Sequence, residues 1–240
     1  MLRYSKILYL FLYLLVLVVM VAGCVRPAAT PVATVPPTPS TAPTPQLPAP
    51  MLIASRWTFD TDPVGGPPQG ATVFSGNWLV RAESDTPSVP NALCQTGRAT
   101  FPAMTLSDAV YTDVLVSTRF KPISGSIDRA AGIIFHVQDE NNYYIVRANA
   151  LEDNVDIRKY VNGSRSTLKV RSVEVLSGQW QELRVEVLGS RIQGFLNDQL
   201  VVEISDDTFK SGKVGLWTKA DSVTCFDDVE VRAPSNQVVR

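Results

Sequence analysis

The 240-residue sequence contains few of the side chains that carry out metal or nucleophilic chemistry. It has one histidine, His136, and three cysteines, none of which form a Cys-x-x-Cys pair. Structural zinc sites need four nitrogen or sulfur ligands, so the sequence does not predict one. A Gly-x-Ser-x-Gly motif is also missing, which argues against a serine nucleophile on a strand-to-helix elbow.

Charge is scarce at the N-terminus and is not concentrated elsewhere. Arg3, Lys6 and Arg26 are the only charged residues before position 51, so residues 51–240 carry 22 − 3 = 19 basic and 23 acidic side chains. Their net charge is therefore 19 − 23 = −4. No basic block with interleaved aromatic residues stands out, and we expect no nucleic-acid partner.

The first 24 residues are organised like an export signal. Arg3 and Lys6 precede an apolar run over residues 7–20, and residues 21–24 read Val-Ala-Gly-Cys. A basic start, a short hydrophobic segment and small residues before a cleavage site are typical of a secretory signal peptide. The last four residues resemble the lipobox of bacterial lipoproteins. This resemblance implies a signal peptide over residues 1–23, cleavage before Cys24 and lipidation of Cys24 with a palmitate-type acyl chain.

The resemblance also implies a location. The protein is expected at a cell membrane, held by its N-terminal lipid and facing outside the cytoplasm, and more than one acyl chain would anchor it firmly. The alternative is that residues 7–22 remain as a transmembrane anchor. These sixteen residues are slightly short of the roughly 20 needed to cross a bilayer. Under both interpretations the domain lies outside the cytoplasm.

A proline-rich segment follows the predicted lipid site. Residues 25–50 contain nine of the 17 prolines, together with threonine and alanine and no acidic residue. Proline fixes φ and lacks an N–H donor, so such a segment does not build a packed core. We interpret residues 24–50 as the lipidated cysteine and a disordered linker, with a reach of roughly 80 Å at about 3.1 Å per residue.

Residues 51–233 have the pattern of one all-β domain, followed by a short tail over residues 234–240. Short runs of alternating and β-branched residues are separated by turn signals such as Asn162-Gly163 and Asn197-Asp198. This pattern predicts an antiparallel sandwich or barrel. One helical turn is expected over residues 206–210. The predicted strands are 110–120, 131–137, 143–148, 155–161, 181–187, 191–196, 199–204, 213–218 and 226–231.

Several motifs occur in the order found in a known fold family. They are Gly132-Ile-Ile-Phe135, Asp139-Glu-Asn-Asn-Tyr-Tyr144, Gly178-Gln-Trp-Gln-Glu-Leu-Arg-Val185, Asn197-Asp-Gln-Leu200, Ser211-Gly-Lys-Val-Gly-Leu216 and Phe226-Asp-Asp-Val229. Together they resemble concanavalin A-like lectin and glucanase jelly rolls, in particular laminin G-like and 3-keto-disaccharide hydrolase-like domains. The resemblance implies a two-sheet antiparallel jelly-roll sandwich whose ligands lie on the concave sheet. It does not specify a chemistry, because fold does not fix function.

Alternation along three of the predicted strands places polar side chains on one face. Residues at even spacing in a strand share a face, and the apolar partners of these side chains would occupy the core. If the strands pair in sequence order, the polar side chains form one patch suited to sugar hydroxyls. A solvated face with ordinary ion pairs is the alternative. The predicted ligand-binding residues are His136, Tyr143, Arg147, Asn149, Asp156 and Arg158.

Catalytic residues are harder to find. The resemblance to glucanases would bring a strand of the Glu-x-Asp-x-x-Glu type, and the sequence has none, so a two-carboxylate mechanism lacks its residues. No catalytic residue is therefore assigned. The resemblance to 3-keto-disaccharide hydrolases leaves open a hydrolase or lyase that uses His136 as acid or base.

Two further features concern stability. Cys94 and Cys225 are an even pair in a domain expected outside the cytoplasm, and we predict a disulfide between them, with two buried thiols as the alternative. Acidic pairs lie near the two ends of the domain, where they could bind a structural Ca²⁺ or only cap turns. The candidate calcium ligands are Asp60, Asp62, Asp227 and Asp228.

These observations favour a non-catalytic, lipid-anchored binding module at the cell surface, with carbohydrate as its expected ligand. No cofactor is required by this interpretation. The alternative is a hydrolase or lyase acting on a 3-keto-disaccharide or another glycoside.

Overall fold

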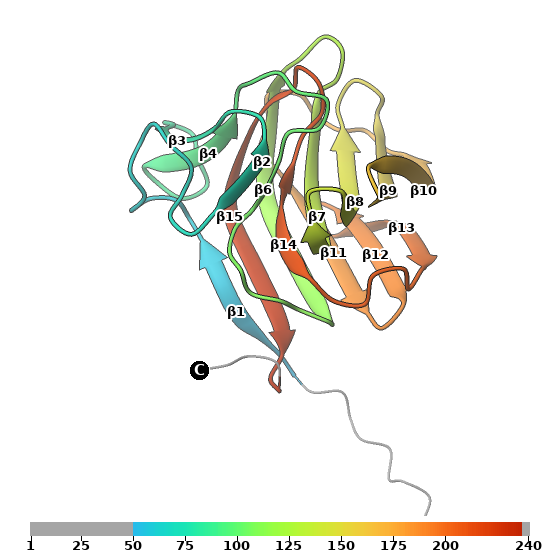
Figure 1. Cartoon of the computed structure of the whole chain (residues 1–240). Helices are drawn as coiled ribbons and strands as arrows, with labels where there is room; N and C mark the ends of the chain where they lie inside the picture. The colour runs from blue at the N-terminus through green and yellow to red at the C-terminus, as the bar shows by residue number, and fades with distance from the viewer. Residues whose placement is uncertain (1–49, 237–240) are drawn as a thin grey trace, which may run out of the picture. The chain divides into compact units, whose positions relative to one another are not determined.

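The structure is a computed structural model that describes residues 50–236. The predicted signal peptide, the lipidation site Cys24, the linker up to residue 49 and the last four residues lie outside this range. Within it, all regular secondary structure is β-strand (Figure 1). Residues 206–210 form no helical turn, so that expectation was wrong. The described range has no helix with the length and hydropathy of a membrane span.

The strands form two antiparallel sheets. The first contains β1 (Met51–Trp57), β3 (Trp78–Ala82), β4 (Asn91–Gln95), β6 (Val114–Ser124), β11 (Gln181–Leu188), β12 (Arg191–Leu196), β13 (Gln199–Ser205) and β15 (Val223–Pro234). Its order is β13-β12-β11-β6-β15-β4-β3, and β1 also pairs with β15. The second contains β2 (Thr72–Ser75), β5 (Ala103–Thr105), β7 (Ala130–Asp139), β8 (Asn142–Asn149), β9 (Asn154–Val161), β10 (Ser164–Ser172) and β14 (Lys213–Trp217). Its order is β10-β9-β8-β7-β14-β5-β2.

The core lies between the two sheets. In β6, Val114, Val116 and Phe120 are buried and alternate with half-buried residues, and they pack in the same cluster as Ile133 and Phe135 of β7. Burying such a side chain stabilises the fold by about 1.5–3 kcal/mol. The predicted two-sheet antiparallel sandwich of the jelly-roll type is thus confirmed (Figure 1).

Hairpin turns occur where the sequence predicts them. Asn162 and Gly163 have φ values of 48° and 78°, and Asn197 and Asp198 have 48° and 63°. Two successive positive φ values are characteristic of the type I′ turn, whose twist matches that of the flanking strands. These turns connect β9 to β10 and β12 to β13.

The predicted disulfide between Cys94 and Cys225 is present, with an S–S distance of 2.01 Å. The two cysteines are register partners on neighbouring strands β4 and β15. Their neighbours Leu93 and Phe226 belong to the core, so the disulfide lies on the outer face of the eight-stranded sheet.

Candidate functional site

The outer face of the seven-stranded sheet, which is turned away from the other sheet, carries a second buried cluster. Along β8, Tyr144 and Val146 pack in the core, whereas Tyr143 and Ile145 belong to the second cluster. Residues Ala103, Ala130, Ile134, Val137, Tyr143, Ile145 and Trp217 make up this cluster. Loops must therefore cover part of a sheet face that the alternation pattern alone would leave in solvent.

Polar residues of β8 and β9 lie on this same outer face, but they are not exposed. Arg147, Asn149 and Asp156 each have a relative exposure of 0%, and Arg158 is half-buried. The expectation of a solvent-facing patch is therefore not met. One reason is Asp128, from the loop before β7, which accepts a hydrogen bond of 2.9 Å from the Asn149 amide and is itself buried.

Arg147 is the centre of a buried network of charges. Its Nη2 lies 2.7 Å from a carboxylate oxygen of Asp156 and 2.7 Å from one of Glu152, and it donates a 3.1 Å hydrogen bond to Asn154. Its Nη1 lies 3.9 Å from Asp128. Burial opposes ionisation of Glu152, but hydrogen bonds from Asn154 and Arg147 outweigh it and lower its pKa to about 2.

A turn over residues 126–128 places Asp128 beside Arg147 in this network. Asp221 accepts hydrogen bonds of 2.9–3.1 Å from all three backbone N–H groups of the turn. These bonds hold the pKa of Asp221 below its ordinary range, and the bond from the Ser126 N–H has the largest effect. Asp128 also forms an ion pair with Lys219. Residues far apart in sequence thus close one end of the outer face.

His136 lies away from the network, contrary to the sequence prediction. The β7–β8 register shifts between Phe135 and Asp139, and His136 has a φ of 47°. This bulge turns the imidazole away from the outer face. Nδ1 lies 2.9 Å from the carbonyl oxygen of Phe209, and Nε2 lies 2.7 Å from that of Thr112. The histidine contacts two loops, and no hydrogen bond or ion pair in the described structure joins its ring to another predicted site residue.

A groove of about 500 Å³ lies on the outer face where aromatic rings meet polar side chains. We call it the aromatic groove. It is lined by Phe74, Ser75, Ala99, Thr100, Phe101, Ala103, Glu140, Asn141, Tyr143 and Tyr160.

Phe101 is central to the aromatic groove. Its ring centroid lies 5.6 Å from that of Tyr160 in an edge-to-face arrangement, and 5.9 Å from Trp217 in a stacked one. Tyr143 lies 5.1 Å from Tyr160 at the base of the groove, and burial raises the pKa of its hydroxyl. Half-buried Phe74, Phe101 and Tyr160 offer ring surface to a ligand, whereas Tyr143 supports them from below.

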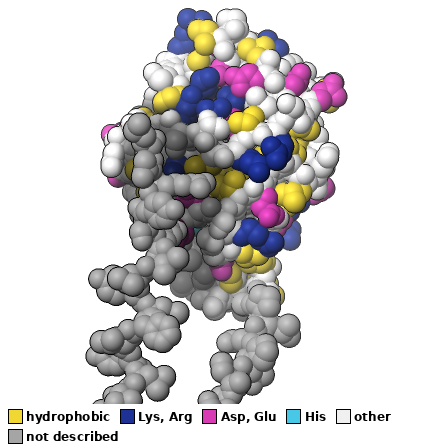
Figure 2. Space-filling model, turned by 90° about the vertical axis from the view of Figure 1, so that its right-hand side faces the viewer, with side chains coloured by type: hydrophobic (Ala, Val, Ile, Leu, Met, Phe, Trp, Pro, Cys, Tyr) yellow, Lys and Arg dark blue, Asp and Glu magenta, His cyan; other side chains and the backbone are white. Residues whose placement is uncertain are grey.

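A second groove of about 520 Å³ adjoins the first at residues 99–101. Three of its lining side chains are cations, and we call it the basic groove. It is lined by Arg98, Ala99, Thr100, Phe101, Ile127, Arg165, Lys219, Ala220 and Asp221. Figure 2, which views the molecule from the side on which β10 lies in Figure 1, shows Lys and Arg side chains grouped beside hydrophobic patches.

The acidic pairs at the domain ends are each engaged by protein groups. Asp60 and Asp62 accept backbone N–H groups of different loops, and Asp228 pairs with Arg56 at 2.9 Å. Asp227 accepts hydrogen bonds from residues 86–88. These four carboxylates are not among the groups of possible metal ligands found in residues 50–236. Asp60, Asp62 and Asp227 thus make hydrogen bonds of the turn and capping kind and Asp228 forms an ion pair, and calcium binding stays a prediction.

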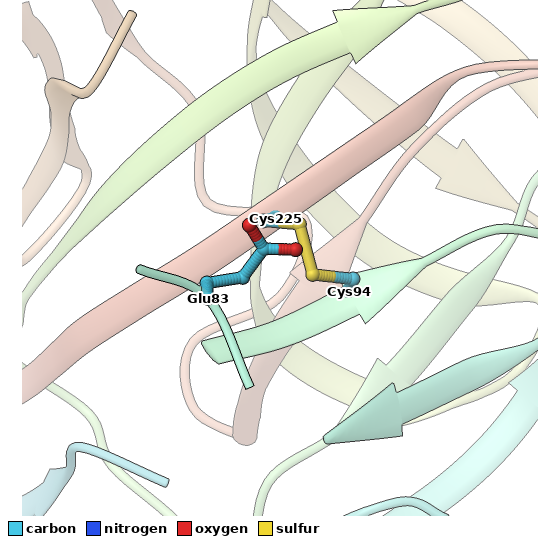
Figure 3. Close-up of side chains that lie close together, drawn as sticks. All are labelled: Glu83, Cys94 and Cys225. Carbon is cyan, nitrogen blue, oxygen red and sulfur yellow. A yellow bond between two sulfur atoms is a disulfide. The ribbon is translucent and has the colours of Figure 1, made fainter. Parts of the chain in front are cut away.

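One acidic side chain approaches the disulfide. Glu83, Cys94 and Cys225 have potential ligand atoms within 4.8 Å of one another (Figure 3). Metal ions bind the thiolate form of cysteine, and both sulfur atoms are engaged in the disulfide. Glu83 instead pairs with Arg81. With the disulfide formed, this group is not a metal site.

Sequence reasoning did not find most of the groove residues. Phe101 and Arg98 lie in an irregular stretch between β4 and β5, and Arg165 lies on a strand that the alternation pattern did not reveal. The available signal was an aromatic residue in a turn-rich segment, since exposed aromatic residues often mark binding surfaces. Nothing local indicates that Lys219 approaches the same place.

The comparisons with known proteins agree with this fold. The sequence matches the model of a family described as 3-keto-alpha-glucoside-1,2-lyase-like domain over residues 70–232. A levanase of Bacillus subtilis (strain 168) is 25% identical over 163 residues, which are 67% of this chain and 22% of the levanase. The chain thus matches about a fifth of that enzyme's length.

Two solved structures are similar in fold. The carbohydrate-binding module CBM66 from Bacillus subtilis has a TM-score of 0.58 and 23% identity, covering 68% of this chain and 96% of the module. The GH43 protein BlXynB from Bacillus licheniformis has a TM-score of 0.54 and 14% identity, covering 74% of this chain and 39% of that protein. At these identities the likeness concerns the fold.

Proposed function

The chain belongs to the 3-keto-alpha-glucoside-1,2-lyase-like domain family, and from this membership we propose that residues 51–233 form a carbohydrate-binding module. Two relatives support the proposal. One is named as a carbohydrate-binding module, and this chain covers 96% of it. The other is a levanase of which the chain matches only 22%, a share that fits one module of a larger enzyme better than a whole one.

The aromatic groove is the observation that carries the proposal. The ring of Phe101 lies between Tyr160 and Trp217, with Glu140 and Asn141 on the same groove. Sugar rings have apolar C–H faces that pack on aromatic rings, and hydroxyl groups that bond to carboxylate, amide and hydroxyl side chains. A pocket with apolar walls and a few polar groups is the usual form of a small-ligand site.

The test is retention of the purified chain on a glycan array, with two phenylalanine variants compared. Phe101→Ala removes the central ring of the aromatic groove, whose centroid lies 4.5 Å from the guanidinium carbon of Arg165. Phe195→Ala is the matched control, because it removes a ring of the other sheet over which Arg184 lies at 4.0 Å. We expect Phe101→Ala to lose about 2 kcal/mol of binding, or on the order of 30-fold, and Phe195→Ala to bind normally.

Lack of retention on every glycan would refute carbohydrate binding. Equal loss in the two variants would instead remove the aromatic groove from the proposal, since it would show a general effect of losing a stacked ring.

A second candidate function is cleavage of a 3-keto-disaccharide or another glycoside, which the name of the family supports. Glu140 is the carboxylate among the described residues that line the aromatic groove. If the groove is catalytic, the chain will release a sugar from a 3-keto-glucoside, and Glu140→Gln will abolish release without abolishing binding. No release by the unmodified chain would leave the binding module as the function.

We also propose that Cys24 anchors the module to a cell membrane through a lipid. The sequence Val-Ala-Gly-Cys after a basic and then apolar segment supports this proposal. A tethered module is concentrated at the surface, so a modest affinity for a glycan suffices for capture.

A further inference from the structure

The basic groove contains an arginine that the described part of the chain leaves without a partner. Arg165 of β10 forms no side-chain hydrogen bond or ion pair with another described residue, and its Nη1 is buried and unsatisfied. Its guanidinium lies over Phe101 at 4.5 Å, which orients it along the groove. The other guanidinium donors, Nε and Nη2, are not buried and also have no acceptor among the described residues, so they are free to bind a ligand that supplies one.

The charges around Arg165 also favour an anionic ligand. Burial first, and then repulsion by Arg158 and Arg147, lower its pKa. The nearby acids are engaged elsewhere: Asp156 pairs with Arg158 at 2.6 Å and with Arg147 at 2.7 Å. A bound anion would relieve the repulsion among these arginines.

The basic groove has two further cations, which make its electrostatic potential more positive. Arg98, with a side-chain exposure of 75%, and Lys219 also line it, against one carboxylate, Asp221. Arg98 lies 3.5 Å from Asp221, and Lys219 pairs with Asp128, so Arg165 is the cation of the groove that has no carboxylate partner among the described residues. Asp221 is held by the backbone of residues 126–128. The groove therefore has three cations and one anion, although residues 51–240 carry a net charge of −4.

We propose that the basic groove binds an acidic sugar residue, whose carboxylate or sulfate group is held by Arg165 and Arg98. This inference rests on the proposed carbohydrate binding and specifies its ligand class. The apolar side chains of Ala99, Ile127 and Ala220 give the sugar ring a surface. The guanidinium group supports the charge, because its planar donors match the geometry of an oxyanion.

The experiment is titration calorimetry of the purified chain with matched polysaccharides. Polygalacturonate is compared with its methyl ester, which keeps the backbone and removes the charge, and dextran sulfate is compared with dextran. We expect at least about tenfold tighter binding to a charged form, weakening with added salt. Tighter binding of polygalacturonate assigns a carboxylate to the site, and tighter binding of dextran sulfate assigns a sulfate.

Arginine variants locate the binding. Arg165→Gln is expected to weaken binding of the charged polymer by about tenfold or more and to leave the neutral polymer unaffected. Arg98→Ala should weaken it less, because this side chain is more exposed. Arg171→Ala is the matched control: it lies exposed on the same strand and does not line the groove. Thermal unfolding of each variant checks that it is folded.

The possible failures are distinct. Equal affinity for charged and neutral polymers, or an Arg165→Gln variant that binds like the control, overturns the acidic-sugar inference and leaves carbohydrate binding intact. Equally tight binding of a single-stranded oligonucleotide overturns it too, as it would show unselective attraction of polyanions. Absence of binding to every glycan overturns both the inference and the proposed function.

Discussion

Arg147 and Asp156 face each other as register partners on β8 and β9, 2.7 Å apart, and neither side chain is exposed to solvent. Moving two charges out of water is expensive, and only close mutual contact with further hydrogen bonds offsets that cost. Glu152, Asn154 and Arg158 provide those bonds. The pair therefore forms part of the buried framework of the outer face, and neither residue lines the aromatic groove or the basic groove.

Loss of Arg147 should destabilise the domain. Arg147→Met removes one of the two cations that pair with buried Asp156 and one of the two that face buried Asp128, and removing one partner of a buried pair costs up to about 3–5 kcal/mol. Urea unfolding measures the change in free energy, with exposed Arg171→Ala as a control expected within about 0.5 kcal/mol of the unmodified chain. A further Asp156→Leu change should restore part of the loss. Equal stability of Arg147→Met and the control would contradict this account.

Acid should weaken the fold in part through Glu152. Its pKa in the folded protein is about 2, below the ordinary 4.5. A lowered carboxyl pKa stabilises the fold above pH 4.5, and this contribution is lost as the pH falls towards 2. In Glu152→Gln the decline in the free energy of unfolding over this range should be smaller. Chemical unfolding at several pH values measures both curves, and parallel curves would count against the assignment.

Removing the disulfide should lower stability without affecting ligand binding. Cys94 and Cys225 are separated by 131 residues, and a loop of that size contributes on the order of 4 kcal/mol in the chain-entropy model. The double change Cys94→Ala and Cys225→Ala should show this loss in urea. Its glycan affinity should be unchanged, because the cysteines lie on the opposite sheet. Free thiols in the unreduced protein, detected by mass spectrometry, would contradict the bridge.

His136→Ala separates structure from binding. The substitution removes the contacts of the imidazole with the carbonyl groups of Thr112 and Phe209, and losing a hydrogen bond costs about 0.5–1.5 kcal/mol. The expected result is a lower unfolding temperature with normal retention on glycans below it. A folded variant that has lost glycan binding or sugar release would show that His136 takes part in function.

Cys24→Ser tests the proposed anchor. Cells fed an alkyne analogue of palmitate should label the unmodified chain and not the variant, because the serine hydroxyl cannot form the thioether to the lipid. Normal labelling of the variant would contradict the lipid-anchor proposal. The same variant should be released from the membrane fraction.

Much of the architecture was visible in the sequence because strand formation follows local rules. Alternating patterns located nine of the strands, including β6 and β11, and the pairs Asn162-Gly163 and Asn197-Asp198 located two turns. β2, β3, β4 and β5 were missed because they are short, and β1 and β10 were missed because none of their side chains is fully buried. A strand with no buried face has no hydrophobic period to detect.

The site was less predictable. Alternation correctly put Arg147 and Asp156 on the face opposite the core, but it assumed an unbroken period of two, and the bulge at His136 breaks it. It also could not show that Asp128 and Lys219 cover these side chains.

The sequence by itself determined the two-sheet β architecture and the cysteine pair, since hydrophobic period and turn residues act over a few neighbours. Only the tertiary structure decided that the polar residues are buried, that His136 lies elsewhere and that Arg165 meets Phe101 in a groove. Those outcomes depend on segments that are tens of residues apart in the sequence. These segments meet because the whole sandwich packs together, and no local sequence pattern specifies that they meet.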